Sequence, residues 1–291
     1  MRILPFIQSS HVAREVTLFL TKSSASNCIS AAREAKFRNA LSNDEFLVVY
    51  QPRESASNGT LLGMEALLWW THPVDGNVKA SEFLQLAEET GLIIELGKLV
   101  VEKVCSQIAG WVHAGREPLP VSINVSNHEL INADMVDFLS ATLARYQINP
   151  GLIQLELKEQ TAMGADAKIR LELKTIQQAG IKLLIDNFGI GEVSITTLQA
   201  MAFDMLKVHH SLTSKVGAFK EGNTFFSAVI TMAHALGMRV VAEGVESQAQ
   251  ANVLRDLGCD ELQGFHVSSP LRPPEMTALL PLRSSIPRRS F

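Results

Sequence analysis

The sequence is poor in cysteine, in tyrosine and in net charge, and it contains no long hydrophobic run. Its three cysteines are far apart and in none of the spacings that bind zinc, so we expect reduced thiols and no disulfide framework. The formal net charge of -4 gives no electrostatic reason to expect a nucleic-acid polymer as a partner. No apolar stretch is long enough to cross a bilayer, and we therefore predict a cytoplasmic protein without direct membrane insertion.

The chain divides into three parts by composition and pattern. Residues 1–34 show no clear alternation of strands and helices, and we predict a short N-terminal appendage there. Residues 35–282 carry a regular alternation and are predicted to form one domain. Residues 283–291 are rich in Ser, Pro and Arg, which predicts a mobile tail.

Short apolar segments alternate with helix-like segments throughout the predicted domain. The predicted strands are Phe46–Tyr50, Leu61–Leu68, Val121–Val125, Ile153–Leu157, Lys182–Asp186, Met205–Val208, Arg239–Ala242 and Glu261–Phe265. Pro52 has no N–H to donate to a sheet, so we expect the first strand to stop before it. The pattern is typical of eight parallel strands that close into a TIM-like (β/α)8 barrel of the α/β class.

Helix-like segments separate most of the predicted strands. They cover Ala31–Leu41, Ser81–Glu89, Ile94–Ala114, Met135–Tyr146, Lys168–Ala179, Phe225–Leu236 and Gln248–Leu257. Several of them end in a glycine shortly before the next strand, at Gly115, Gly180, Gly237 and Gly258. Glycine adopts the left-handed conformation that ends a helix without steric penalty, so this repeat marks the junctions between helices and strands.

Polar side chains stand at or near the ends of the predicted strands. They are Gln51, Asn124, Glu156, Asp186, Lys207, Glu243 and Gln263, and an eighth, Glu65, lies within the second strand. Enzymes on parallel barrels carry their chemistry at the carboxyl ends of the strands. Four carboxylates gathered there would repel one another unless divalent cations lie among them, so the pattern predicts a metal site in the barrel mouth.

Each of these residues also has a purely structural explanation. Taken alone, Glu65 is more often a surface carboxylate, and Lys207 is as often a solvated lysine at the end of a strand. Glu243 and Glu246 could instead complement the dipole of a helix that begins there. The glutamines are the least specific, because glutamine makes many structural hydrogen bonds.

The neighbouring residues His209 and His210 are not predicted to bind zinc. Adjacent residues of a strand face opposite sides of the sheet, so their rings should point apart. No Gly-x-Ser-x-Gly nucleophile motif occurs, and the chemistry therefore has no visible covalent protein nucleophile.

The order of several motifs resembles the bacterial EAL domain family, which hydrolyses the second messenger cyclic di-GMP. The motifs are Glu65-Ala66-Leu67, Ser122-Ile123-Asn124-Val125-Ser126, Glu156-Leu157-Lys158-Glu159, Asp186-Asn187-Phe188-Gly189, Leu206-Lys207-Val208-His209, Val241-Ala242-Glu243-Gly244-Val245-Glu246 and Gln263-Gly264-Phe265. The resemblance covers nearly all of the predicted barrel. It implies an EAL-type barrel that converts cyclic di-GMP to linear pGpG, and it suggests a homodimer.

The resemblance also implies a role for each matching residue. It places a first Mg²⁺ or Mn²⁺ ion at Glu65, Asn124, Glu156 and Asp186, and a second at Asp186, Asn187 and Glu243. Lys207 would orient or polarise the attacking water, with catalytic roles for Asp186 and Glu243 as well. The implied substrate contacts are Gln51, Leu68, Trp69, His209 and Gln263, and the implied supporting residues are Glu159 and Glu246. Two ions about 4 Å apart activate water and neutralise the departing oxygen.

Five residues depart from the family pattern, and two of them, Ile190 in place of a small polar residue and Glu192 in place of an aromatic one, lie in the loop that couples the metal site to the dimer contact. Asn187 stands where the family has its second aspartate, which predicts a weaker second ion and slower hydrolysis. Trp69 replaces an arginine that contacts the ligand, and His209 replaces an aspartate. Two alternatives therefore stay open beside the enzyme: an inactive receptor for cyclic di-GMP, and a protein that regulates a protein partner by contact.

Overall fold

The computed structural model describes residues 34–72, 76–131, 134–192 and 194–283. The appendage predicted over residues 1–34 lies outside this part of the chain except for Glu34. The tail predicted over residues 283–291 lies outside it except for Arg283, whose backbone N–H donates to the carbonyl of Gly115. The boundaries of the three predicted parts stay predictions.

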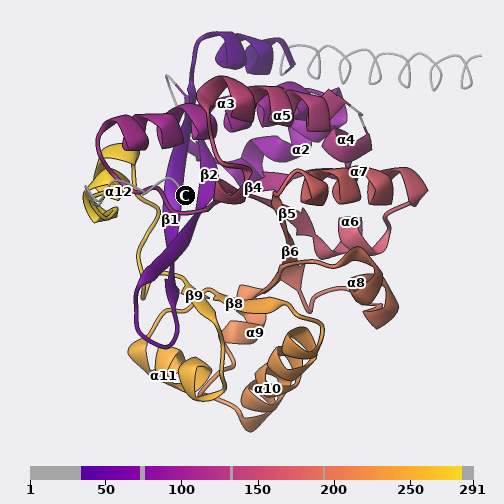
Figure 1. Cartoon of the computed structure of the whole chain (residues 1–291), viewed down its shortest axis with the longest axis vertical. Coiled ribbons are helices and arrows are strands. Elements are labelled where there is room, and N and C mark those ends of the chain that lie inside the picture. Colours follow the sequence, from indigo (N-terminus) through magenta and orange to yellow (C-terminus); the bar gives the residue numbers. More distant parts are fainter. Residues whose placement is uncertain (1–33, 73–75, 132–133, 193, 284–291) are drawn as a thin grey trace, which may run out of the picture.

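Eight strands close into a barrel (Figure 1). They are β1 (Phe46–Ser55), β2 (Leu61–His72), β4 (Val121–Val125), β5 (Ile153–Lys158), β6 (Lys182–Phe188), β7 (Met205–Val208), β8 (Arg239–Glu243) and β9 (Glu261–Gln263). The sheet order is β1-β9-β8-β7-β6-β5-β4-β2, closed by pairing of β1 with β2, and β3 (Gly76–Lys79) extends β2 outside the ring. The predicted TIM-like barrel is confirmed.

The prediction of eight parallel strands is wrong for β1. This strand runs antiparallel to both of its neighbours, β2 and β9, whereas the other barrel strands pair in parallel. The strand also continues through Pro52, which pairs with Met64. Since β9 pairs with β1 only at Glu54 and Ser55, Pro52 has a partner strand on one side only, where a missing N–H is tolerated.

Helices surround the barrel. The segment at residues 34–42 is helical. The others are α2 (Ala80–Thr90), α3 (Ile93–His113), α4 (Asn127–Ile131), α5 (Asp134–Tyr146), α6 (Glu159–Met163), α7 (Ala167–Gln178), α8 (Ile195–Met201), α9 (His210–Thr213), α10 (Lys220–Ala235), α11 (Gln248–Asp256) and α12 (Pro273–Leu279). All four glycines predicted to end helices have positive φ, between 70° and 89°.

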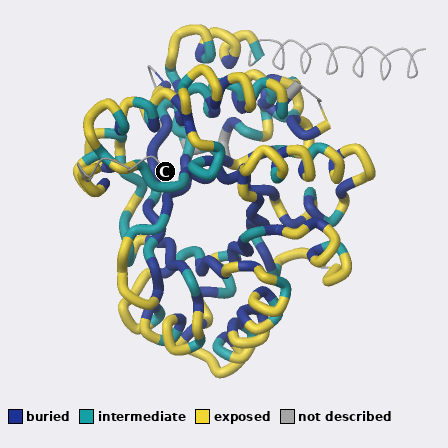
Figure 2. The backbone as a smooth tube through the Cα atoms, viewed as in Figure 1, coloured by how far each residue is buried: buried dark blue, intermediate teal, exposed yellow. Residues whose placement is uncertain are grey.

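The core lies between the strands and the inner faces of the helices. Figure 2 shows the buried backbone as an inner ring and the exposed backbone on the outer turns of the helices. The thiols of Cys105 and Cys259 are buried in this core, and burial raises the pKa of each to about 12, which keeps them protonated. In the described part of the chain, no helix has the length and hydropathy needed to cross a bilayer.

Candidate functional site

Side chains from separate strands converge at the barrel mouth around the ammonium group of Lys207 on β7. Its Nζ lies 2.5 Å from Oε2 of Glu65 and 3.1 Å from Oε2 of Glu156. The nearest oxygen of Asp186 is 3.8 Å away. Glu65 on β2 and Lys207 on β7 are 142 positions apart in the sequence, and their strands stand opposite each other in the closed ring, so this contact crosses the barrel interior.

Amide side chains complete the contacts of Glu65. Asn124 donates from Nδ2 to Oε1 at 2.8 Å, and Gln263 donates from Nε2 to Oε2 at 2.8 Å. Gln263 also donates to Oε1 of Gln51 at 3.2 Å, and Gln51 donates to the carbonyl of Ser268 at 3.3 Å. We use the name mouth cluster for Glu65, Asn124, Glu156, Asp186, Lys207 and Glu243.

The orientation of β1 explains how Gln51 reaches this cluster. Gln51 lies within the strand, not at its trailing end as the parallel arrangement implied, and it pairs directly with Glu65 of β2. Because β1 is antiparallel, the middle of this strand lies level with the mouth. Gln51 and Glu65 both lie near the middle of long strands, β1 (Phe46–Ser55) and β2 (Leu61–His72).

Burial and neighbouring charges shift the pKa values of the carboxyl groups in the mouth cluster. Burial, the charge of Glu65 and the charge of Asp186 together raise the pKa of Glu156 to about 7, against the opposing ammonium of Lys207. Burial also raises the pKa values of Asp186 and Glu243. Burial would raise the pKa of Glu65 as well, but the Lys207 ammonium and three hydrogen bonds lower it below the ordinary value.

Lys207 is fully buried and nevertheless holds its proton. Burial alone would lower the pKa of its ammonium group, but Glu156, Glu65, Asp186 and Glu243 raise it well above the ordinary value. Four carboxylates therefore surround one positive charge, which leaves the cluster with surplus negative charge when all of them are ionised.

The carboxylate and amide oxygens of the mouth cluster are suitable ligands for divalent cations. Oε1 of Glu156 and Oε2 of Glu243 are buried and have no hydrogen-bond partner, so each is an available ligand atom. Together with the Asn124 amide they form an oxygen-only donor set, which hard cations such as Mg²⁺ and Mn²⁺ prefer. No group of three or more His, Cys, Asp and Glu side chains is already arranged around a common point within the described ranges. At the mouth, the Lys207 ammonium lies among the carboxylates, so an ion would have to displace it from part of these contacts.

The loop after β6 is built on a distorted backbone. Asn187 has a left-handed backbone with φ of 59°, and the pairing of β6 with β7 shifts register between Ile185 and Phe188. Asparagine tolerates this conformation better than most residues. Glu159 accepts a hydrogen bond from the backbone N–H of Gly189 at 2.9 Å and therefore holds the loop from the side of β5.

A cavity of about 400 Å³ adjoins the mouth cluster next to β1, β8 and β9. Five of the predicted residues line it, namely Gln51, Trp69, Glu243, Glu246 and Gln263. His210, Phe265 and Pro270 line it too, and Phe265 is 70% exposed. Rings from three separate segments thus border one space beside the acidic groups.

Leu68 and His209 lie elsewhere. Leu68 lines a second cavity of about 400 Å³ on the other side of Asn124, between β2, α2 and α3. His209 accepts the backbone N–H of Ser211 at Nδ1 and so caps the start of α9. The prediction that His209 and His210 point apart is wrong, because β7 ends at Val208 and the two ring centroids are 4.0 Å apart.

The sequence argument did not assign His210, Phe265 or Pro270 to the site. Phe265 was within a recognised motif, directly after Gln263 and Gly264, so its signal was available. His210 was hidden by the assumption that the strand continued through it. Pro270 lies in a loop with no pattern of its own, and only the fold brings it to the cavity.

The chain is similar to known signalling proteins over most of its length. Residues 34–270 match the EAL domain family. The chain is 34% identical over 242 residues to the bifunctional diguanylate cyclase/cyclic di-GMP phosphodiesterase MucR of Pseudomonas aeruginosa, a match that covers 83% of this chain and 35% of MucR. It is 36% identical over 244 residues to the signalling protein YkoW of Bacillus subtilis, with 84% and 30% covered. The chain thus spans about a third of these relatives.

Two solved structures have the same fold. The phosphodiesterase PaMucR in complex with c-di-GMP superposes with a TM-score of 0.79 at 32% identity, covering 83% of this chain and 98% of that one. The EAL enzyme Bd1971, bound to cAMP and cyclic di-GMP, gives a TM-score of 0.82 at 25% identity, with 94% and 76% covered.

Proposed function

Because the chain belongs to the EAL domain family, we propose that it hydrolyses cyclic di-GMP to linear pGpG in a reaction that depends on Mg²⁺ or Mn²⁺. The observation that carries this proposal is the convergence of Glu65, Glu156 and Asp186 on one point in the barrel mouth. MucR, a relative named as a cyclic di-GMP phosphodiesterase, supports the substrate, and its solved structure holds c-di-GMP.

We assign the ions to the mouth cluster. Glu65, Asn124, Glu156 and Asp186 would hold the first ion, and Asp186, Asn187 and Glu243 the second. When bound, divalent ions lower the pKa of water and neutralise charge on the phosphodiester. The buried oxygens of Glu156 and Glu243 that lack partners are the groups that gain most from such binding.

Lys207 acts as a proton-bearing group in this scheme. Its raised pKa keeps Nζ protonated, so it donates hydrogen bonds and is not a general base. Released from part of its contacts with the carboxylates, the ammonium would orient the attacking water or a phosphoryl oxygen. Its burial makes that contact stronger than the same contact in water.

The substrate would lie across the cavity beside the cluster. Gln51 and Gln263 present amide groups to it, whereas Trp69, His210 and Phe265 present rings. Aromatic faces stack on nucleobases with little dependence on base identity. We propose that a guanine occupies this space, with Trp69 stacking in place of the hydrogen bonds that an arginine would give. Leu68, in the cavity on the other side of Asn124, is assigned to the opposite part of the substrate.

Asn187 should make the reaction slow. A neutral amide at this position lacks one unit of attractive charge for the second ion, although its oxygen remains a ligand. Replacement of Asn187 by Asp is expected to raise the rate of pGpG formation with Mn²⁺ by about tenfold or more. Asn252→Asp, on the exposed face of α11, is the matched control and should leave the rate unchanged. Equal rates for the native chain and Asn187→Asp would reject the proposal of a weakened second ion.

The same residue favours a second function, that of a receptor which binds cyclic di-GMP without hydrolysing it. Calorimetry with cyclic di-GMP and Ca²⁺ measures binding, and product analysis with Mn²⁺ measures turnover. Binding without product, in the native chain and in Asn187→Asp alike, would establish the receptor. Absence of both would point to a regulator that acts on a protein partner.

We also propose a homodimer and a cytoplasmic location, since a nucleotide second messenger acts inside the cell. Ile190 and Ile195 follow Asp186 closely and are 53% and 58% exposed, which supports a contact surface there. Light scattering of the native chain and of Ile195→Lys tests the dimer. A native chain that is monomeric throughout its accessible concentration range would refute it.

A further inference from the structure

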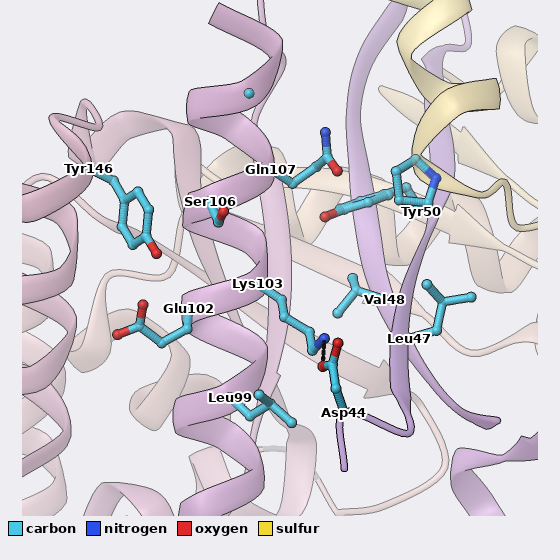
Figure 3. Close-up of a pocket in the computed structure, with 12 residues that line it drawn as sticks. Asp44, Leu47, Val48, Tyr50, Leu99, Glu102, Lys103, Ser106, Gln107 and Tyr146 are labelled. Atoms are coloured by element: carbon cyan, nitrogen blue, oxygen red, sulfur yellow. Dashed lines mark hydrogen bonds and ion pairs between the residues drawn. The ribbon is translucent and has the colours of Figure 1, made fainter. Parts of the chain in front are cut away.

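A cavity of about 490 Å³ lies on the outside of the barrel wall, between β1, α3 and α12 (Figure 3). We call it the side cavity. Side chains of a strand alternate between its two faces. Gln51 of β1 points to the mouth, whereas Tyr50 lines the side cavity. The side cavity is therefore separated from the proposed active site by the thickness of the barrel wall.

Tyr50 presents a buried polar group to the side cavity. The residue is only 1% exposed, and its ring packs against Trp111 with centroids 5.1 Å apart. In Figure 3 its hydroxyl points toward the α3 residues Ser106 and Gln107. A ligand in the side cavity could donate a hydrogen bond to this hydroxyl or accept one from it.

The remaining polar groups are either neutral or already neutralised. Ser106 and Gln107 offer a hydroxyl and an amide along one side of the side cavity. The charged residues that line it are ion-paired, Lys103 with Asp44 and Glu102 with Arg145. The two pairs balance the charges that line the side cavity, so it offers no unpaired charge to attract an ionic ligand, whose phosphate would lose hydration on entering.

Apolar and aromatic surface completes the lining. Val48 of β1 faces Leu99 of α3 across the side cavity, and Leu47 lines its edge. Both tyrosines of the chain, Tyr50 and Tyr146, line it. Its volume falls within the range of about 300 to 1,000 Å³ that is usual for small-molecule sites, and the mixture of apolar walls with a few polar groups is also usual there.

We propose that the side cavity is a second ligand site, which takes a neutral heteroaromatic molecule of about nucleoside size with hydrogen-bond donors and acceptors on its ring. Tyr50, Ser106 and Gln107 bond the edge of the ring, and Leu47, Val48 and Leu99 contact its faces. The site does not depend on metal at the mouth or on the reaction proposed there.

The two tyrosines give a direct test. Protein labelled with 3-fluorotyrosine has one ¹⁹F signal for each tyrosine, and both report on the side cavity. Adenosine is the neutral probe, and AMP is the same molecule with a charged phosphate. We expect saturable shifts of both signals with adenosine, and at least about tenfold weaker binding of AMP.

Ser106→Leu fills the side cavity from an exposed position and should weaken adenosine binding by about tenfold or more, with an unchanged thermal unfolding curve. Ser227→Leu, at an exposed position of α10, is the matched control and should bind like the native chain. Overturning results are shifts that never saturate, saturation with equal affinity in Ser106→Leu, or AMP binding as tightly as adenosine. Loss of binding in Ser227→Leu would also overturn the proposal, because it would place the probe elsewhere.

Discussion

The barrel encloses two polar clusters, one at each end, and they differ in their balance of charge. At the mouth, four carboxylates share the single ammonium of Lys207. At the opposite end lies a second group, which we call the floor cluster and which consists of Arg53, Gln154, Arg239 and Glu261. The fully buried Arg53 pairs with Glu261 at 3.2 Å and donates a hydrogen bond to Gln154 at 2.5 Å. Arg239 adds a second guanidinium 3.1 Å from Glu261. The floor therefore has no negative charge left over.

The difference separates structure from function. A buried ionic cluster that neutralises itself stabilises one arrangement of the strands and needs nothing from outside. A cluster with surplus negative charge is costly unless cations enter it. The same barrel provides both, because the antiparallel β1 carries Gln51 to the mouth and Arg53 to the floor. Substitutions at the two ends should therefore have opposite effects.

Glu156→Gln should show the largest effect. Removal of one carboxylate from the mouth cluster should lower hydrolysis by about a thousandfold, or about 4 kcal/mol of transition-state stabilisation. Stability in urea at pH 8 should stay the same or rise, because the pKa of Glu156 is raised to about 7 and its ionisation opposes folding at that pH. Kinetics and urea unfolding of the same preparation measure the two effects. A variant that is both active and less stable would contradict the assignment.

Glu261→Gln should have the opposite signature at the floor cluster. It leaves Arg53 buried without a counter-charge, and we expect a loss of about 3 to 5 kcal/mol in the free energy of unfolding. Chemical denaturation measures this loss, and the exposed Glu246→Gln is the matched control. A change below about 1 kcal/mol, comparable to a surface pair, would remove the distinction between the two ends.

Glu129→Gln tests a buried carboxyl that belongs to neither cluster. Burial raises the pKa of Glu129 to about 7, against hydrogen bonds from Ser126 that lower it. Because the folded protein holds this proton more tightly than the unfolded chain, the contribution of Glu129 to stability is complete below the unfolded pKa near 4.5. It is lost as the pH rises from there through 7. The loss amounts to at most about 3 kcal/mol. Glu129→Gln should flatten this part of the pH profile of urea unfolding. An unchanged slope would show that Glu129 titrates near its ordinary pKa.

The periodic apolar segments were sufficient to predict the barrel, but they did not carry the direction of β1. An apolar pattern is the same in a parallel and an antiparallel strand. The relevant signal was the short connection between Ser55 and Leu61, since parallel neighbours need a crossover of about a dozen residues or more. Because of this error, the sequence argument placed Gln51 at the end of a strand, whereas it lies in the middle of β1.

The site was predictable where a motif fixed a residue at a strand end and less so where loops decide. Lys207 was expected at the mouth, but its place at the centre of the carboxylates depends on closure of the barrel, which brings Glu65 and Glu156 to it from strands that do not adjoin β7. His210 reaches its cavity because α9 begins directly after His209, a boundary that the apolar pattern does not mark. Metal binding by these residues stays a prediction.

The most direct test of the account is calorimetric titration of the native chain with Mn²⁺, alongside Glu156→Gln and Asp186→Asn. Surplus negative charge at the mouth predicts saturable binding by the native chain, weakened by at least about tenfold in each variant, and unchanged in the control Glu221→Gln, at an exposed position of α10. If the native chain binds no Mn²⁺, or if both mouth variants bind it with native affinity, the mouth cluster is not a metal site.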